Sequence, residues 1–154
     1  MRISRHQMFM EMARVVAKRS TCPRLNVGAV VVVENRVVSI GYNGSLPGDA
    51  HCSDEGCILS DGHCIRTIHA EVNALEHVKI AGDQWSLYVT NSPCQSCAEK
   101  ILRYPIRYLF FDHPYHPLHP VEFLMRHGVR VFRIVPSGYI VDQFTKEVVD
   151  EAGP

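Results

Sequence analysis

The sequence lacks an excess of charge of either sign. Its 16 lysines and arginines balance its 16 aspartates and glutamates over 154 residues, so the formal net charge is zero. A general nucleic-acid-binding protein needs a basic surface that displaces counterions from phosphates, and this composition argues against that class. A small phosphorylated ligand held by a few local arginines is still compatible with it.

The sequence also lacks an apolar run long enough to cross a membrane. Residues Met1 to His6 lead directly into an amphipathic pattern, without the apolar core and cleavage site of a signal peptide. We therefore expect a cytoplasmic protein, or one in a host's cytoplasm if a phage encodes it, with no membrane partner. Disulfides are disfavoured there, so the six cysteines indicate metal or thiol chemistry, with buried free thiols as the alternative.

The apolar patterns predict an α/β protein. Helical spacing from Arg5 to Lys18 predicts an amphipathic helix, and the β-branched run from Val27 to Val33 predicts a buried strand. Further strands are expected at 37–42, 86–90, 107–111 and 129–135, and further helices at 67–80, 94–104 and 121–127. Because strands alternate with helices after the opening hairpin, we expect helices covering a mixed sheet in one domain over residues 1–154. The tail from residue 141 is expected to form a short docking helix or to fray.

The strongest chemical signal is a pair of short motifs, each at the start of a predicted helix. They are His69-Ala70-Glu71 and Pro93-Cys94-Gln95-Ser96-Cys97. Cys94 and Cys97 share a helix face, and the positive end of the helix dipole favours their thiolate forms. One imidazole and two thiolates leave a tetrahedral Zn²⁺ with an open position, which is the arrangement of a catalytic site.

Glu71 is suited to act as a base beside this metal. It points away from His69 on a helix, so it is a poor fourth ligand. The combined pattern H-x-E…P-C-x-x-C is typical of zinc deaminases that act on nucleobases. The alternative is that Cys94 and Cys97 are core thiols and that Glu71 is a solvated helix residue.

The chain resembles the deoxycytidylate (dCMP) deaminases of the cytidine deaminase superfamily, in the short form found in bacteria and phages. The resemblance covers residues 19 to 97, with a looser match through Tyr115 and Gly128-Val129. The matching stretches are Arg19–Arg24, Val27–Ala29, Gly41–Ser45, His51-Cys52, Arg66–Ala74 and Pro93–Cys97. The resemblance implies a three-layer α/β/α fold with a central mixed five-stranded sheet.

The resemblance also implies zinc-dependent hydrolysis of dCMP to dUMP and ammonia, which would supply dUMP for thymidylate synthesis. His69, Cys94 and Cys97 would hold Zn²⁺, and Glu71 would move protons between water, the cytosine N3 and the departing amine. Asn43 matches a position that binds the sugar 3′-hydroxyl, with a turn asparagine as the alternative. Other substrate-binding candidates, mainly for the 5′-phosphate, are Arg24, Asn26, Arg66, Arg107 and Tyr115.

The irregular segment from Asn43 to Arg66 is long enough to need a function or an organiser of its own. A second, structural Zn²⁺ would organise it, and the alternative is a set of reduced, unligated thiols. The candidate ligands are Cys22, His51, Cys52, Cys57 and Cys64. Their spacing contains no Cys-x-x-Cys, so four ligands cannot be selected from it.

Regulation and assembly are implied by the resemblance alone. Many dCMP deaminases are hexamers that dCTP activates and dTTP inhibits. The corresponding effector site would include Gly44, Asp49 with Mg²⁺, and His63, with an ordinary flexible loop as the alternative.

Two other functions compete with dCMP deamination. The first is deamination of another substrate, such as cytidine, deoxycytidine or a tRNA adenosine; the balanced charge disfavours the tRNA. The second is a non-catalytic structural zinc module, which normally has four protein ligands rather than three.

Overall fold

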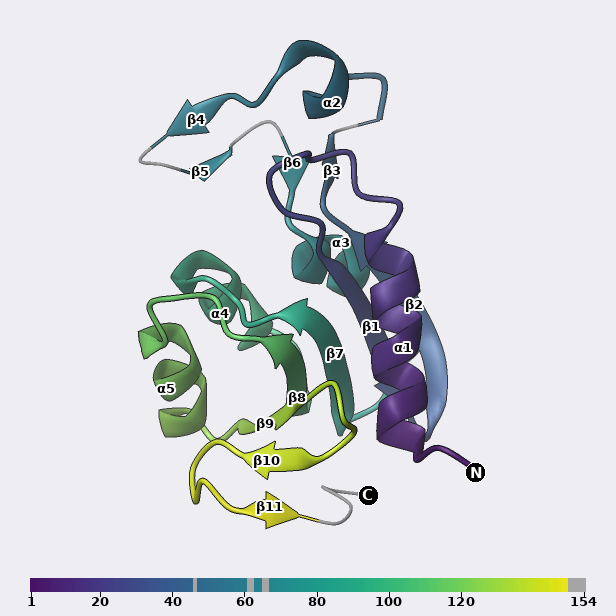
Figure 1. Cartoon of the computed structure of the whole chain (residues 1–154), viewed down its shortest axis with the longest axis vertical. Coiled ribbons are helices and arrows are strands. Elements are labelled where there is room, and N and C mark those ends of the chain that lie inside the picture. Colours follow the sequence, from purple (N-terminus) through teal and green to yellow (C-terminus); the bar gives the residue numbers. More distant parts are fainter. Residues whose placement is uncertain (46, 61–62, 65–66, 150–154) are drawn as a thin grey trace.

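The computed structural model describes residues 1–45, 47–60, 63–64 and 67–149. Its main element is a seven-stranded mixed sheet in the order β11-β10-β9-β8-β7-β1-β2 (Figure 1). The strands are β1 (Gly28–Val33), β2 (Arg36–Tyr42), β7 (Trp85–Asn91), β8 (Ile106–His113), β9 (Arg130–Ile134), β10 (Ile140–Asp142) and β11 (Val148–Val149). β7, β8 and β9 are parallel, and the other neighbouring pairs are antiparallel. The predicted α/β class with a mixed sheet is confirmed.

The prediction of five strands was wrong in number, because the tail adds β10 and β11. Ile140 pairs with Ile134 of β9 and is only 2% exposed, so the tail extends the apolar sheet. The turn that follows is held by Asp142, whose carboxylate accepts the backbone N–H of Phe144 at 2.8 Å. Over residues 141–149, strand pairing and a side-chain-stabilised turn therefore replace the predicted docking helix or frayed end, and residues 150–154 lie outside the described part of the chain.

The helices form one layer on each side of the sheet (Figure 1). The longer ones are α1 (Arg5–Ala17), α3 (Ala70–Glu76), α4 (Gln95–Ile101) and α5 (His119–Arg126). In β1, Val30 and Val32 pack toward α1, whereas Ala29, Val31 and Val33 pack toward α3. The predicted three layers follow directly from this alternation of side chains along a strand that is buried on both faces.

Local sequence explains where α1 begins. Ser4 caps the helix: its hydroxyl accepts the Gln7 N–H at 3.1 Å, and the Gln7 side chain accepts the Ser4 N–H at 3.0 Å. This reciprocal arrangement satisfies two backbone donors that the first turn leaves without helical partners. No helix in the described part of the chain is both long and apolar enough to cross a membrane.

The predicted helix over 67–80 was too long at both ends. Thr67 and Ile68 form β6 (Thr67–Ile68), which pairs with β3 (Gly44–Ser45), and α3 begins only after His69. Between these strands lie α2 (Cys52–Glu55) and the small hairpin of β4 (Leu59–Ser60) and β5 (His63–Cys64). In Figure 1 this segment projects beyond one end of the main sheet, above the N-terminus of α3.

Candidate functional site

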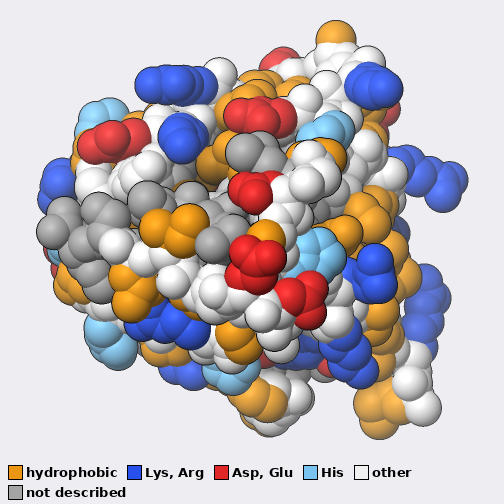
Figure 2. Space-filling view, turned by 90° about the horizontal axis from the view of Figure 1, so that it is seen from above, with side chains coloured by type: hydrophobic (Ala, Val, Ile, Leu, Met, Phe, Trp, Pro, Cys, Tyr) orange, Lys and Arg blue, Asp and Glu red, His pale blue; other side chains and the backbone are white. Residues whose placement is uncertain are grey.

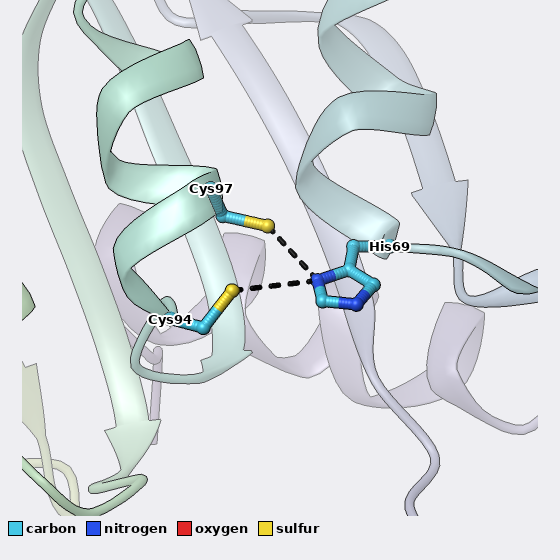
Figure 3. A group of neighbouring side chains, drawn as sticks. All are labelled: His69, Cys94 and Cys97. Atoms are coloured by element: carbon cyan, nitrogen blue, oxygen red, sulfur yellow. Dashed lines mark hydrogen bonds between the residues drawn. The ribbon is translucent and has the colours of Figure 1, made fainter. Parts of the chain in front are cut away.

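Two helix N-termini bring together the three predicted metal ligands (Figure 3). His69 is the N-cap residue of α3, Cys94 is the N-cap residue of α4, and Cys97 lies one turn into α4. The His69 Nδ1 atom lies 3.0 Å from the Cys97 sulfur and 3.6 Å from the Cys94 sulfur. Within the described ranges, this is the group of three potential ligands whose donor atoms all lie within 4.8 Å of one another.

The electrostatics of the three side chains favour a bound cation. Hydrogen bonds from Cys97 and from His69 lower the pKa of Cys94 to about 3. The same Cys94 partner raises the pKa of His69, and the hydrogen bond with Cys94 together with burial raises the pKa of Cys97. One thiolate therefore forms readily, and the second thiol gives up its proton when a metal replaces it. The donor set of one imidazole and two thiolates fits Zn²⁺ with a position left open.

Glu71 lies in the first turn of α3 beside this group. Its side chain is only 5% exposed, although it belongs to the wall of a pocket. Burial raises the pKa of the Glu71 carboxyl above its usual range. A carboxyl with a raised pKa is suited to hold a proton and release it at neutral pH, which is the property of a general acid and base.

A pocket of about 270 Å³ opens onto Glu71 and two of the predicted metal ligands, His69 and Cys94. Asn43 lies in its wall, and its amide oxygen accepts the Val27 N–H at 2.8 Å while its amide nitrogen donates to the Leu25 carbonyl at 2.6 Å. Asn43 thus ties the 20–27 loop to the end of β2 and retains a second amide hydrogen. The two alternatives for Asn43, a ligand contact and a loop-forming role, are compatible in this geometry.

The phosphate candidates separate into different places. Arg24 and Tyr115 line the pocket. Asn26 is exposed and is not among the lining residues. Arg107 lies at the start of β8, whereas the pocket is at the opposite end of the sheet, where β7 ends. Arg66 lies outside the described residues.

Sequence reasoning missed Asn91 and Ser92, which also line the pocket. They follow the last buried residues of β7 and immediately precede Pro93, but no local pattern marks them as site residues. Their surroundings depend on the strand that lies next to β7 in the sheet. The parallel pairing with β8 identifies that strand, and the local sequence does not.

The remaining cysteine and effector candidates lie in or near the projecting segment. Cys22 and Cys52 are buried, and Cys57 is half-buried. His51 is the N-cap residue of α2, Gly44 belongs to β3, and Asp49 is exposed with its carboxylate accepting the Ala50 N–H. The side chains of His63 and Cys64 lie outside the described part of the chain, so the second metal site stays a prediction.

Comparison with known proteins gives a consistent result. Residues 3–112 match the family described as the cytidine and deoxycytidylate deaminase zinc-binding region. The chain is 42% identical over 151 residues to the ComE operon protein 2 of Bacillus subtilis, covering 95% of this chain and 79% of that protein. It is 35% identical over 139 residues to the deoxycytidylate deaminase of Schizosaccharomyces pombe, covering 83% of this chain and 43% of that relative. This chain therefore spans less than half the length of the yeast protein.

A solved structure shares the fold. The dCMP deaminase of the cyanophage S-TIM5, in complex with dCMP and dUMP, superposes with a TM-score of 0.75 at 29% identity. The match covers 86% of this chain and 98% of the phage protein.

Proposed function

This chain belongs to the cytidine and deoxycytidylate deaminase family, and we propose that it is a zinc-dependent hydrolase that converts dCMP to dUMP and ammonia. The observation that carries the proposal is the group of His69, Cys94 and Cys97 beside the buried carboxyl of Glu71, at the wall of one pocket. A structural zinc module would need a fourth protein ligand and would have no use for a buried acid at this position.

The residues of the chain divide the chemistry between them. His69, Cys94 and Cys97 would hold a zinc ion, which would supply Lewis acidity and so lower the pKa of a water molecule. Glu71 takes one proton from the attacking water as its oxygen bonds to C4, and delivers that proton to N3 of the cytosine ring. Glu71 then takes the second proton from the same oxygen and passes it to the amino nitrogen as the bond from C4 to that nitrogen breaks, which leaves the C4 carbonyl of dUMP and ammonia. Its raised pKa suits both transfers.

A mononucleotide fits the pocket better than a polymer does. Asn43, Arg24 and Tyr115 line the pocket. Asn43 would contact the sugar, and Arg24 and Tyr115 would supply a cation and a hydroxyl to a 5′-phosphate. On the face that carries the projecting segment, acidic side chains lie among basic ones (Figure 2). That mixture is unlike the basic surface that a tRNA-binding deaminase uses, and it favours a small substrate.

Glu71→Gln tests the proposal. It removes the proton-carrying oxygen but keeps the size of the side chain, so we expect zinc content to stay the same and the rate of ammonia release from dCMP to fall about 10³-fold or more. Glu76→Gln, on the exposed end of the same helix, is the matched control and should keep native turnover. Unchanged turnover in Glu71→Gln would refute the assigned role.

The substrate is tested separately with the wild-type protein loaded with zinc. Ammonia release from dCMP should exceed that from deoxycytidine and cytidine, because only dCMP uses the phosphate contacts. If the protein turned over the free nucleosides, or adenosine in tRNA, faster than dCMP, the proposal of dCMP as the substrate would be wrong.

We extend the proposal to regulation, assembly and context. dCTP would activate and dTTP would inhibit through Gly44, Asp49 with Mg²⁺, and His63, in a hexamer of single-domain chains in the cytoplasm that supplies dUMP for thymidylate synthesis. Sigmoidal dCMP kinetics that become hyperbolic with dCTP would support regulation, and indifference to both triphosphates would refute it.

The second, structural zinc site has a separate test. Two zinc ions per chain by elemental analysis would support this site, and one zinc ion per chain would exclude it.

A further inference from the structure

Ser92 is a buried polar residue that the proposed chemistry does not use. It is 3% exposed and lies just after β7, two residues before the ligand Cys94. Its hydroxyl oxygen accepts the backbone N–H of Tyr115 at 2.6 Å and donates to the carbonyl of the same Tyr115 at 3.4 Å. One hydroxyl therefore holds both backbone polar groups of a single distant residue.

The segment that receives these bonds has little else to hold it. It joins β8 to α5, and two of its residues, Pro114 and Pro117, have no backbone N–H to donate. Within the described part of the chain, the bonds to Ser92 are the hydrogen bonds that tie residues 114–117 to another segment. The Ser92 N–H adds a bond to the His113 carbonyl at 3.0 Å, which extends the pairing of β7 with β8.

Ser92 thus connects two parts of the same pocket. On one side it continues into the segment that carries Cys94, and on the other it fixes the backbone of Tyr115, whose side chain lines the pocket. Without the hydroxyl, the N–H and carbonyl of Tyr115 lose their partner and the segment gains conformational freedom. The distance between the Tyr115 side chain and the metal ligands would then no longer be set.

We propose that Ser92 is a positioning residue that fixes Tyr115 relative to the metal ligands and so sets the affinity for the substrate phosphate. This rests on the proposed dCMP deaminase function. In this proposal Ser92 acts through Tyr115.

The test compares Ser92→Ala with Ser39→Ala. Ser39→Ala also removes one hydroxyl bond to the backbone, which the half-buried Ser39 donates to the Ala74 carbonyl at 2.6 Å, but Ser39 lies outside the pocket. With zinc-loaded protein, Ser92→Ala should raise KM for dCMP about tenfold, with kcat and zinc content unchanged. Ser39→Ala should change none of the three. A KM for dCMP that stays native in Ser92→Ala would overturn the proposal.

A second comparison shows whether Ser92 acts through Tyr115. In a Tyr115→Ala background, Ser92→Ala should add no further increase in KM, because the side chain that it positions is already absent. A full tenfold effect in that background would overturn the proposal, and so would a loss of zinc from Ser92→Ala, which would place its action at the metal site.

Amide hydrogen exchange supplies a readout that does not depend on turnover. The Tyr115 N–H should exchange slowly in the wild-type protein and about tenfold faster in Ser92→Ala. An unprotected Tyr115 N–H in the wild-type protein would overturn the proposal even if Ser92→Ala failed to fold. If wild-type protein releases no ammonia from dCMP, the proposed function fails, and the exchange result still decides whether Ser92 holds Tyr115.

Discussion

Replacing Gly41 by alanine tests whether the contact between β2 and α3 sets the position of a metal ligand. Gly41 lies on β2 directly beneath α3, the helix whose N-cap is His69. The other two ligands, Cys94 and Cys97, belong to a separate helix, α4. A displacement of α3 alone therefore changes the distances within the ligand group.

The size of the displacement follows from the backbone geometry. A Cβ at position 41 would lie 2.5 Å from the Ala74 nitrogen and 2.6 Å from the Ala70 carbonyl oxygen, both backbone atoms. To reach even 3.0 Å, α3 must move by about 0.5 Å. Overpacking of this kind costs about 2 kcal/mol, which lowers the unfolding midpoint by roughly 4–8 °C in a domain of this size.

The same movement weakens the metal site. Metal–ligand distances tolerate changes of only about 0.2 Å, so we expect zinc affinity to fall about 10-fold to 100-fold. The assay is a zinc titration against a chromophoric chelator, alongside thermal unfolding of the metal-free protein.

Gly28→Ala is the matched control. A Cβ there would lie 2.0 Å from the Ala13 carbonyl oxygen, so it displaces α1, which carries none of the three ligands. We expect Gly28→Ala to lose at least as much stability and to keep native zinc affinity. Equal zinc affinities in the two variants would refute the reasoning, because α3 would then not be positioned by β2.

Two further predictions concern stability and the pocket. Burial raises the pKa of Tyr88, so the unfolded state releases this proton first and the free energy of unfolding should decrease as the pH rises above about 10. Chemical denaturation from pH 8 to 11 should show a weaker decrease in Tyr88→Phe; an identical pH dependence would contradict the assignment. Asn43→Ala removes the bonds to Val27 and Leu25, so it should destabilise the protein by about 2 kcal/mol and raise KM for dCMP more than it lowers kcat. A native KM together with a native unfolding midpoint would contradict this role.

Much of the fold follows from local patterns. The β-branched run of β1 indicates a strand buried on both faces, and the structure places α1 on one face and α3 on the other. The start of α1 depends on Ser4 and Gln7, which are neighbours in sequence. Such features depend on residues that are close in sequence, so periodicity was enough to predict the strand and the helix.

Elements whose partners are distant in sequence were predicted less well. Thr67 and Ile68 continue the helical pattern of α3, but pairing with Gly44 and Ser45 places them in a strand. The tail residues Ile140 and Val141 have no helical or strand pattern long enough to identify them, and they become a strand because β9 offers an open edge. In both cases a tertiary partner outweighs the local preference.

The site shows the same division. The sequence by itself determined His69, Glu71, Cys94 and Cys97, because metal ligation and proton transfer require particular residue types at fixed spacings from a helix start. Only the tertiary structure decided which other residues share their pocket. It placed Arg107 at the start of β8, which is the end away from the pocket, and it joined Ser92 to Tyr115, 23 positions along the chain. Those contacts arise where separate strands end side by side, and a position along the chain does not reveal its neighbours in space.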